Sequence, residues 1–380
     1  MKLTVTKDEL NEAISVVSRA VSSKTSIPIL NGIKLEASDS GLTLTASDSE
    51  ISIQQFIPRT KGERIIIELD QTGSVVLPAK FFVDIVKRLP SQTIEIEVMD
   101  HFITMIRSGS SEIQLVGLDP EEFPLLPRLS GERVLHLSSG VLGNMIKQTA
   151  FAASVNETSA ILTGIHWSVN QNRLKFVATD RHRLASCEVE INEQQEGYNL
   201  PIVVPAKTLQ ELSKILPEDQ MIVDIVIEDN QVLFKMENVL FYSRILDGTY
   251  PDTSKIIPTV FKTEFTVDTK NLADALDRAY LLSREERTNI VRLVSINDST
   301  IEISSSSSEL GKVTEQLEIE SFTGEPLKIA FNSKYLLDVM KVMDSERVHF
   351  SFTGAMSPII ITPQGSREVL HLILPYRTTN

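Results

Sequence analysis

Apolar residues recur along this 380-residue chain with two periods, one of about 3.6 residues and one of two. Helical spacing is clearest in Leu10–Val21, Leu142–Ala150 and Leu272–Leu282. Shorter amphipathic stretches at Phe81–Leu89, Thr208–Leu216 and Tyr335–Met343 predict three further helices. Polar residues that can cap the first set precede it: Thr6 or Asp8, Ser138 or Ser139, and Thr269.

Strict alternation of apolar and polar residues predicts short β-strands around these helices. Three strands precede the first set of helices, at Lys2–Thr6, Arg133–Leu137 and Glu264–Val267. Six more strands are expected after the helices, at Leu42–Ala46, Leu174–Ala178, Thr300–Ser304, Ile94–Val98, Met221–Ile227 and Val348–Phe352. The serine run that ends at Ser308 is interpreted as a strand end or a loop.

Similar segments recur at a nearly constant distance. Val76–Lys80, Val203–Lys207 and Ala330–Lys334 each introduce a helix, and their lysines are 127 residues apart both times. Pro28–Gly32 and Ala160–Gly164 lie 132 residues apart. A period of this length is that of a whole small domain. We therefore expect three copies of one domain, each with two helices and about eight strands, and near-symmetric objects of this kind often form rings.

The length also favours several domains, because a single hydrophobic core rarely serves a chain of this size. Proline-containing connections at Leu118–Gly131 and Asp247–Thr263 separate the copies. The predicted domains are residues 1–128, 129–252 and 253–380.

Composition is that of an ordinary soluble protein, with 42% apolar and 23% charged residues. No apolar run approaches the ~20 residues that a membrane span needs, and Met1–Val5 is interpreted as a strand, not a signal peptide. Cys187 is the single cysteine, so an intrachain disulfide and a cysteine-rich zinc site are excluded. We expect a cytoplasmic protein.

The net charge of −14 is unevenly distributed. The six predicted helical windows carry 13 Lys and Arg against 8 Asp and Glu, so the remainder of the chain is strongly acidic. One interpretation is that surface helices simply carry lysine. The other is that the helices share one face that attracts a phosphate backbone, while the acidic remainder repels it.

The clearest catalytic candidate is Asp180–Arg183, where an aspartate could orient a histidine base. No nucleophile can be placed beside it, and Cys187 is expected to be buried and inert. The sequence has no glycine-rich phosphate loop. Metal-ligand spacing is missing among the six histidines, His101, His136, His166, His182, His349 and His371. We expect no catalysis, no cofactor and no metal.

Four motifs in order carry a family resemblance: Thr25–Leu30, Ala178–Leu184, Leu246–Asp252 and Leu374–Arg377. With the three-fold repeat, they make the whole chain resemble the bacterial sliding clamps, the beta subunits of DNA polymerase III, especially those of low-GC Gram-positive bacteria. The resemblance implies an α+β fold with three copies of a DNA-clamp domain, each with two helices packed on antiparallel sheets. It also implies a head-to-tail dimer that forms a closed ring, with helices inside and sheets outside.

Such a ring would act as a DNA polymerase processivity factor. Twelve helices spaced 8–10 Å apart would leave a bore of roughly 22–28 Å, enough for double-stranded DNA. The resemblance implies sequence-independent sliding on DNA and tethering of the replicative DNA polymerase, the clamp loader and repair proteins through short peptide motifs. Partner motifs end in Leu and Phe, with a preceding glutamine. The alternative is a scaffold ring that binds protein partners only.

The resemblance also implies three sets of site residues, each carried over by position. The DNA-binding set is Lys24, Lys80, Asn156, Lys207 and Lys334. The first part of the peptide-binding set is Leu162, Thr179, Arg181, His182, Arg183, Leu184, Pro251, Ile256 and Leu372. Its second part is Asn332, Tyr335, Met356, Pro358, Leu374, Pro375, Tyr376 and Arg377. The dimer set pairs Ile113 and Leu115 of the first domain with Leu281 and Leu282 of the third.

Each set has a plainer interpretation. The lysines could be ordinary solvated side chains, and Leu162, Ile256, Leu372 and Leu374 could belong to the core. Two positions depart from the family pattern. Many members carry a small residue where this chain has Arg181, and many carry arginine where it has Ser159. Arg181 would reshape or add charge to the rim of the peptide site.

Overall fold

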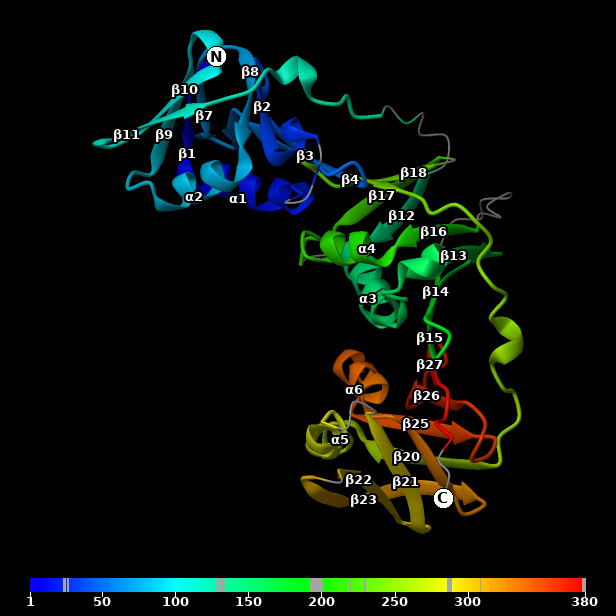
Figure 1. The fold of residues 1–380 in the computed structure, drawn as a ribbon. Helices are drawn as coiled ribbons and strands as arrows, with labels where there is room; N and C mark the ends of the chain where they lie inside the picture. Colours follow the sequence, from blue (N-terminus) through cyan, green and yellow to red (C-terminus); the bar gives the residue numbers. More distant parts are fainter. Residues whose placement is uncertain are drawn as a thin grey trace. The chain divides into compact units, whose positions relative to one another are not determined.

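The computed structural model describes residues 1–22, 25, 27–127, 129, 134–191, 201–218, 220–228, 230–285, 289–307 and 309–377. This part of the chain contains six α-helices, which confirms the six predicted ones (Figure 1). They are α1 Lys7–Val17, α2 Ala79–Arg88, α3 Ser139–Thr149, α4 Ala206–Ser213, α5 Thr269–Ser283 and α6 Ser333–Val342. Within the described residues, none of these helices has the length and apolar character needed to cross a membrane.

The helix starts differ slightly from the predicted caps. Thr6 precedes α1 but makes no side-chain cap. The prediction that Thr269 caps the fifth helix is wrong: Thr269 is its first residue, and the Asp268 carboxylate accepts the N–H of Asn271 at 2.8 Å. A carboxylate is the stronger cap because it also favours the positive end of the helix dipole.

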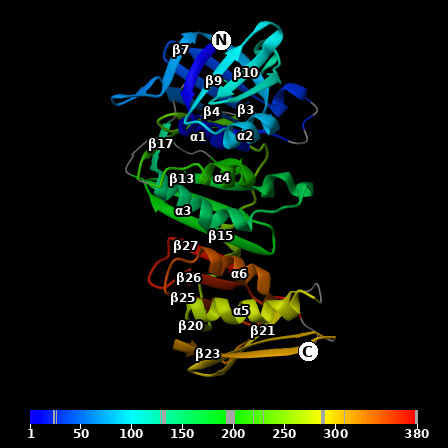
Figure 2. The same cartoon turned by 90° about the vertical axis from the view of Figure 1, so that its left-hand side faces the viewer.

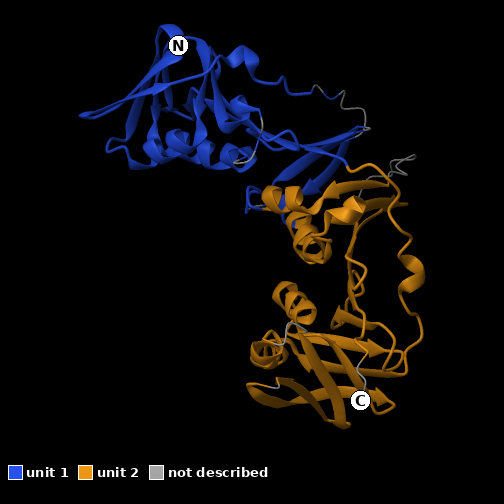
Figure 3. Ribbon diagram, in the orientation of Figure 1, with its two compact units in different colours: residues 1–140, 214–245 blue, residues 141–213, 246–380 orange. Residues whose placement is uncertain are grey.

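The chain divides into two compact units, residues 1–140 with 214–245 and residues 141–213 with 246–380 (Figure 3). The strands of the first unit are β1 Lys2–Thr6, β2 Gly32–Ser38, β3 Gly41–Ser47, β4 Ile51–Pro58, β5 Thr60–Lys61, β6 Arg64–Ile65, β7 Ile67–Gln71, β8 Gly73–Pro78, β9 Thr93–Val98, β10 Ile103–Ser108, β11 Ser111–Val116, β12 Val134–Ser138, β17 Ile222–Glu228, β18 Gln231–Lys235 and β19 Val239–Arg244. Those of the second unit are β13 Gly164–Asn170, β14 Arg173–Thr179, β15 Arg183–Glu190, β16 Ile202–Pro205, β20 Thr263–Asp268, β21 Ile290–Asn297, β22 Thr300–Ser307, β23 Gly311–Gly324, β24 Lys328–Asn332, β25 Arg347–Phe352, β26 Ile359–Pro363 and β27 Val369–Ile373. The predicted strands are thus confirmed, including the serine run as a strand end.

All printed strand pairs are antiparallel, and the helices cover the sheets by their apolar faces. In the first unit, α1 packs on β3 and β4 and beside α2, with Leu10, Ala13, Ile14 and Val17 fully buried. In the second unit, α5 packs on β22 and β23 and beside α6. Figure 2 shows α3, α4, α5 and α6 of this unit facing the viewer together. The helical period therefore predicted the buried faces correctly.

The middle copy contributes one sheet to each unit. Its strands β12, β17, β18 and β19 continue into β4, β3, β2 and β8 of the first copy. Its strands β16, β13, β14 and β15 continue into β27, β26, β25 and β20 of the third. The two units therefore divide the middle copy, and the domain boundaries at residues 128 and 252 stay predictions.

We call each place where edge strands of two copies pair a joint. In the first unit, five pairs run from Ile51↔Ser243 to Gln55↔Val239. In the second unit, five pairs run from Arg183↔Ile373 to Cys187↔Val369. Residues 51 and 183 are 132 apart, the same distance as between the repeated segments, so the two joints share one register. Each joint removes two exposed sheet edges.

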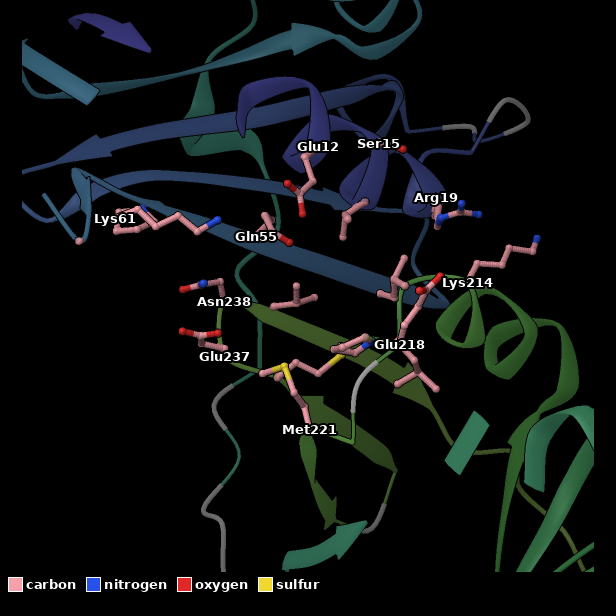
Figure 4. A pocket seen from close by; sticks show the side chains of 18 of the residues that line it. Glu12, Ser15, Arg19, Gln55, Lys61, Lys214, Glu218, Met221, Glu237 and Asn238 are labelled. Atoms are coloured by element: carbon pink, nitrogen blue, oxygen red, sulfur yellow. The ribbon is translucent and has the colours of Figure 1, made fainter. Parts of the chain in front are cut away.

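The joints differ in the helix layer. In the first unit, α1, β4 and residues 214–221 surround a cavity of about 810 Å³, and Figure 4 shows Glu12, Gln55 and Lys61 around it. In the second unit, two side chains of α3 bridge the corresponding place. The Lys147 ammonium lies 2.6 Å from Asp344 Oδ1, and the Gln148 amide donates to the Val342 carbonyl at 2.7 Å. The strand ladder, which both joints share, is therefore the defining part of a joint.

His371 lies at the centre of the second joint and is fully buried. It pairs with Ala185 and packs on Phe151, with ring centroids 5.5 Å apart. The equivalent pair in the first joint is Phe241 with Ile53. Neither ring nitrogen of His371 has a hydrogen-bond partner among the described residues. Burial lowers the pKa of His371 to about 3.

This burial predicts acid sensitivity. Between about pH 6.5, the ordinary histidine value, and pH 3, the unfolded chain binds a proton at His371 that the folded chain does not. Stability contributed by the neutral ring is therefore lost as pH falls through this window. His371→Phe, which copies Phe241, should flatten the dependence of Tm on pH between 6.5 and 4, measured by calorimetry. The exposed control His101→Phe should leave it unchanged, and an unaltered slope for His371→Phe would contradict the account.

Candidate functional sites

The turn between β14 and β15 organises the first part of the predicted peptide site. Asp180 Oδ1 accepts the backbone N–H groups of His182 and Arg183 at 2.9 and 3.0 Å. Thr179 Oγ1 accepts the N–H of Arg181 at 3.2 Å, and the Tyr250 hydroxyl accepts the N–H of Thr179 at 3.1 Å. These bonds satisfy the turn internally, so its side chains are held in fixed positions.

Arg183 connects this turn to α6. Its Nε lies 3.0 Å from Asp180 Oδ2 and its NH1 2.8 Å from Asp338 Oδ2. Its NH2 donates to the Phe151 carbonyl at 2.6 Å, and its Cζ lies 4.6 Å from the ring centroid of Tyr335. The Arg183 side chain is only 12% exposed. All three guanidinium nitrogens are thus used, and Arg183 is a structural tie within the site, not a free ligand contact.

The segment after β27 closes the second part of the site onto the same turn. The Leu374 N–H donates to the His182 carbonyl at 2.9 Å, and the Tyr376 N–H donates to the Ala330 carbonyl at 2.7 Å. The His182 ring stacks with Tyr335 at 6.5 Å between centroids. The structure therefore brings together turn 180–182, the start of α6 and residues 374–376.

The apolar members of the predicted set divide into two groups. Leu162, Leu184 and Leu372 are buried, which supports the plainer interpretation of Leu162 and Leu372 as core. Leu184 and Leu372 join Val177 and Ile360 in a cluster. The exposed apolar side chains are Ile256 at 46%, Met356 at 57%, Leu374 at 38% and Tyr376 at 50%. These four are free to contact a ligand, so the core interpretation of Ile256 and Leu374 is wrong.

The remaining members of the set are placed less closely. Asn332 caps α6, its side chain accepting the N–H of Lys334 at 3.0 Å. Pro251 lies in the segment before β20, while Met356 and Pro358 lie in the loop between β25 and β26. Pro375 and the exposed Arg377 continue the segment after β27. The role of every residue of this set in binding stays a prediction.

The predicted DNA-binding lysines share one position. Lys80, Lys207 and Lys334 are each the second residue of α2, α4 and α6, and all three are exposed. None of them forms a salt bridge within the described part of the chain. Asn156 caps a short helix through the N–H of Thr158, and residues 153–157 share a cavity of about 230 Å³ with Lys207. Lys24 lies outside the described residues.

The predicted dimer residues lie at two sheet margins. Ile113 and Leu115 are half-buried on β11, the edge strand of the five-stranded sheet. They alternate along the strand and share one face. Leu281 is 49% exposed and Leu282 half-buried near the end of α5, the helix that covers β22 and β23.

The catalytic candidate does not survive the geometry. The Asp180 carboxylate is occupied by Arg183 and by backbone N–H groups, and it bonds the main chain of His182, not its ring. Burial raises the pKa of the Cys187 thiol to about 12, so a thiolate nucleophile is excluded there. Among the residues that the structure describes, no three potential metal ligands cluster.

Comparison with known proteins places the chain in a family. Three family models match in order: the N-terminal domain of the DNA polymerase III beta subunit at residues 1–127, the central domain at 136–252 and the C-terminal domain at 254–377. The chain belongs to the DNA polymerase III beta subunit family. This family is non-catalytic.

Relatives named "Beta sliding clamp" match along the full chain. That of Bacillus subtilis (strain 168) is 49% identical, and that of Staphylococcus aureus (strain N315) is 43% identical, each covering 100% of both chains. The crystal structure of the Bacillus subtilis DNA polymerase sliding clamp matches with a TM-score of 0.96 and 48% identity, covering 100% of this chain and 99% of that one. The predicted fold of three clamp domains with antiparallel sheets is confirmed.

Sequence reasoning missed the residues that hold the site together. Asp338 and Tyr250 contact the turn across 155 and 71 residues of sequence. A helical offset offered one weak signal, because Asp338 lies three residues after Tyr335 and therefore on the same face of α6.

Removing Arg183 should destabilise the second unit. Arg183→Ala leaves Asp180 and Asp338 without their partner in a largely buried setting and should cost about 2–3 kcal/mol. We expect a fall in Tm of about 5–10 °C by calorimetry. The matched control is Lys147→Ala, which breaks the exposed pair with Asp344 and should cost at most about 1 kcal/mol. Equally small shifts for the two variants would contradict the role of Arg183.

Proposed function

We propose that two copies of this chain close head to tail into a ring around double-stranded DNA and act as a DNA polymerase processivity factor. The ring tethers the replicative polymerase, the clamp loader and repair proteins through the peptide site and slides without reading sequence. It works in the cytoplasm, where the chromosome lies. Membership of the beta subunit family supports this function, and the repeated joint is the observation that carries it.

The joints indicate how the ring closes. Ladder pairs identify equivalent residues: Ile106↔Ile113, Phe234↔Phe241 and Ile361↔His371 occupy the same place in three hairpins. Ile113 is therefore equivalent to Phe241 and His371, the central residues of the two joints. The strand that carries it, β11, has no partner on its outer side in the described chain.

The second half of a third joint lies on β23. The pairs Leu42↔Ile57, Leu174↔Val189 and Ile301↔Leu317 are equivalent. Counting back four residues from each second member gives Ile53, Ala185 and Val313. Ile53 and Ala185 are the residues opposite Phe241 and His371. Ile113 should therefore lie opposite Val313 of a second copy, and Leu115 opposite Gly311.

The helix layer agrees with this register. Phe151, which packs on His371, is 130 residues before Leu281, the same distance as between the first residues of α3 and α5. Leu281 should therefore pack on Ile113 of a second copy, as the predicted dimer set requires. Half-buried Ile113, Leu115 and Val313 would become fully buried, which supplies a hydrophobic driving force.

The helices supply the DNA-facing surface. Lys80, Lys207 and Lys334 occur once per copy at the same helical position, so a dimer repeats them six times around the bore. Lysine at the start of a helix opposes the helix dipole, so its position there favours an external anion as its partner. Weak phosphate contacts of this kind attract DNA without fixing a register and therefore permit sliding.

Disulfide trapping tests the dimer register. Oxidation of the double variant Ile113→Cys with Val313→Cys should yield a covalent dimer on non-reducing gels, because opposed residues lie within disulfide reach. The control Ile113→Cys with Lys312→Cys places the second thiol on the opposite face of β23 and should stay monomeric on the gel. Equal trapping of the two pairs, or of neither, would refute this register.

Charge reversal tests the DNA surface. The triple variant Lys80→Glu, Lys207→Glu and Lys334→Glu should weaken duplex binding at 50 mM salt by at least about ten-fold and lower its salt dependence, measured by fluorescence anisotropy. Its dimer mass by light scattering should not change. The control reverses three lysines on strands: Lys175→Glu, Lys235→Glu and Lys328→Glu. If the control loses as much affinity as the helix variant, total charge and not the helix surface governs binding.

A further inference from the structure

Arg181 and Ser159, the two positions that depart from the family pattern, contact each other. The Arg181 NH2 group donates to Ser159 Oγ at 2.8 Å. Ser159 lies in the short helix Glu157–Thr163, which precedes β13. The guanidinium is therefore held at a defined place above turn 180–182, although the side chain is exposed.

The charge of Arg181 has no counterion in the described structure. Both oxygens of Asp180, its neighbour in sequence, are taken by the turn and by Arg183. Asp338 binds Arg183 and Lys341. Ser159 supplies only a neutral acceptor. A guanidinium has five N–H donors, so most of the fork of Arg181 remains open to a ligand.

The backbone of the turn separates structural need from ligand binding. Arg181 has φ +76°, a left-handed conformation that is uncommon for arginine. The equivalent turn of the first copy has Ser49 at φ +78°, and Asp48 Oδ1 accepts the N–H groups of Glu50 and Ile51. The conformation therefore belongs to the turn itself. What distinguishes the second copy is the guanidinium that the turn presents.

The guanidinium adjoins the exposed apolar part of the peptide site. The residue next to Arg181, His182, binds the backbone of Leu374 and stacks with Tyr335. An extended peptide advances about 3.3 Å per residue, so a ligand seated on Leu374 and Tyr376 reaches the turn within a few residues. A planar fork beside an apolar surface matches a carboxylate that adjoins apolar anchors.

We propose that Arg181, positioned by Ser159, is a specificity-determining subsite for an acidic side chain of the bound partner peptide. The inference rests on the proposed peptide site and adds the chemical class that this chain selects. Apolar anchors supply most of the affinity, and Arg181 discriminates among partners by the charge of a residue beside them.

The test uses synthetic pentapeptides that begin with Gln and end in Leu-Phe, with Asp or its isostere Asn at one of the inner positions. Binding to the full-length protein is measured by isothermal titration calorimetry at low and high salt. The best Asp peptide should bind about five-fold more tightly than its Asn partner at low salt, and the difference should shrink at high salt. Arg181→Ser, which copies Ser49, should abolish the preference, and Arg181→Lys should retain part of it.

Lys270→Ser removes an exposed cation from α5 and is the matched control for net charge; it should keep the full preference. Ser159→Ala should reduce the preference, because the guanidinium loses its only side-chain anchor. Equal affinity of the Asp and Asn peptides, or a preference that persists in Arg181→Ser, overturns the inference and leaves the peptide site standing. Failure of every peptide to bind overturns the proposed peptide site, and the inference with it.

Discussion

Edge-to-edge pairing of β-strands is the interaction on which this architecture depends. A sheet edge exposes unpaired N–H and C=O groups, and each copy of the repeat has two such edges to satisfy. Pairing β19 with β4 and β27 with β15 satisfies four of them in one register. The same register applied to β11 and β23 would satisfy the last two only with a second chain. Ring closure is thus the continuation of a rule that the chain already follows twice.

The joint tolerates different helix layers. One joint has a cavity between α1 and the segment after α4, while the other is bridged by Lys147 and Gln148. Its central apolar position accepts Phe241 or His371, and Ile113 would be the third variant. Large side chains are thus exchanged while the ladder stays constant, because backbone hydrogen bonds do not depend on side-chain identity. This freedom allows copies of one domain to diverge into a DNA surface and a peptide site.

Most of the fold could be predicted from the sequence because its elements are short, regular and amphipathic. Leu10, Ala13, Ile14 and Val17 predicted the buried face of α1 correctly from spacing alone. The cap of α5 was missed by one residue, since Thr269 and Asp268 are both good caps. The peptide site was located by its motif, but burial of Leu162 and Leu372 and the tie from Arg183 to Asp338 depend on contacts across long stretches of chain. Local periodicity carries no information about such contacts.

Retention on DNA of different topology tests the account most directly. Protein loaded on a nicked circular duplex should remain with it through gel filtration at a salt concentration that abolishes simple ionic binding. Cutting the circle once should release the protein, because a ring held by topology slides off a free end. Protein that remains equally on circular and linear DNA, or on neither, would contradict encirclement, and binding of partner peptides without any retention would favour a scaffold that binds proteins only.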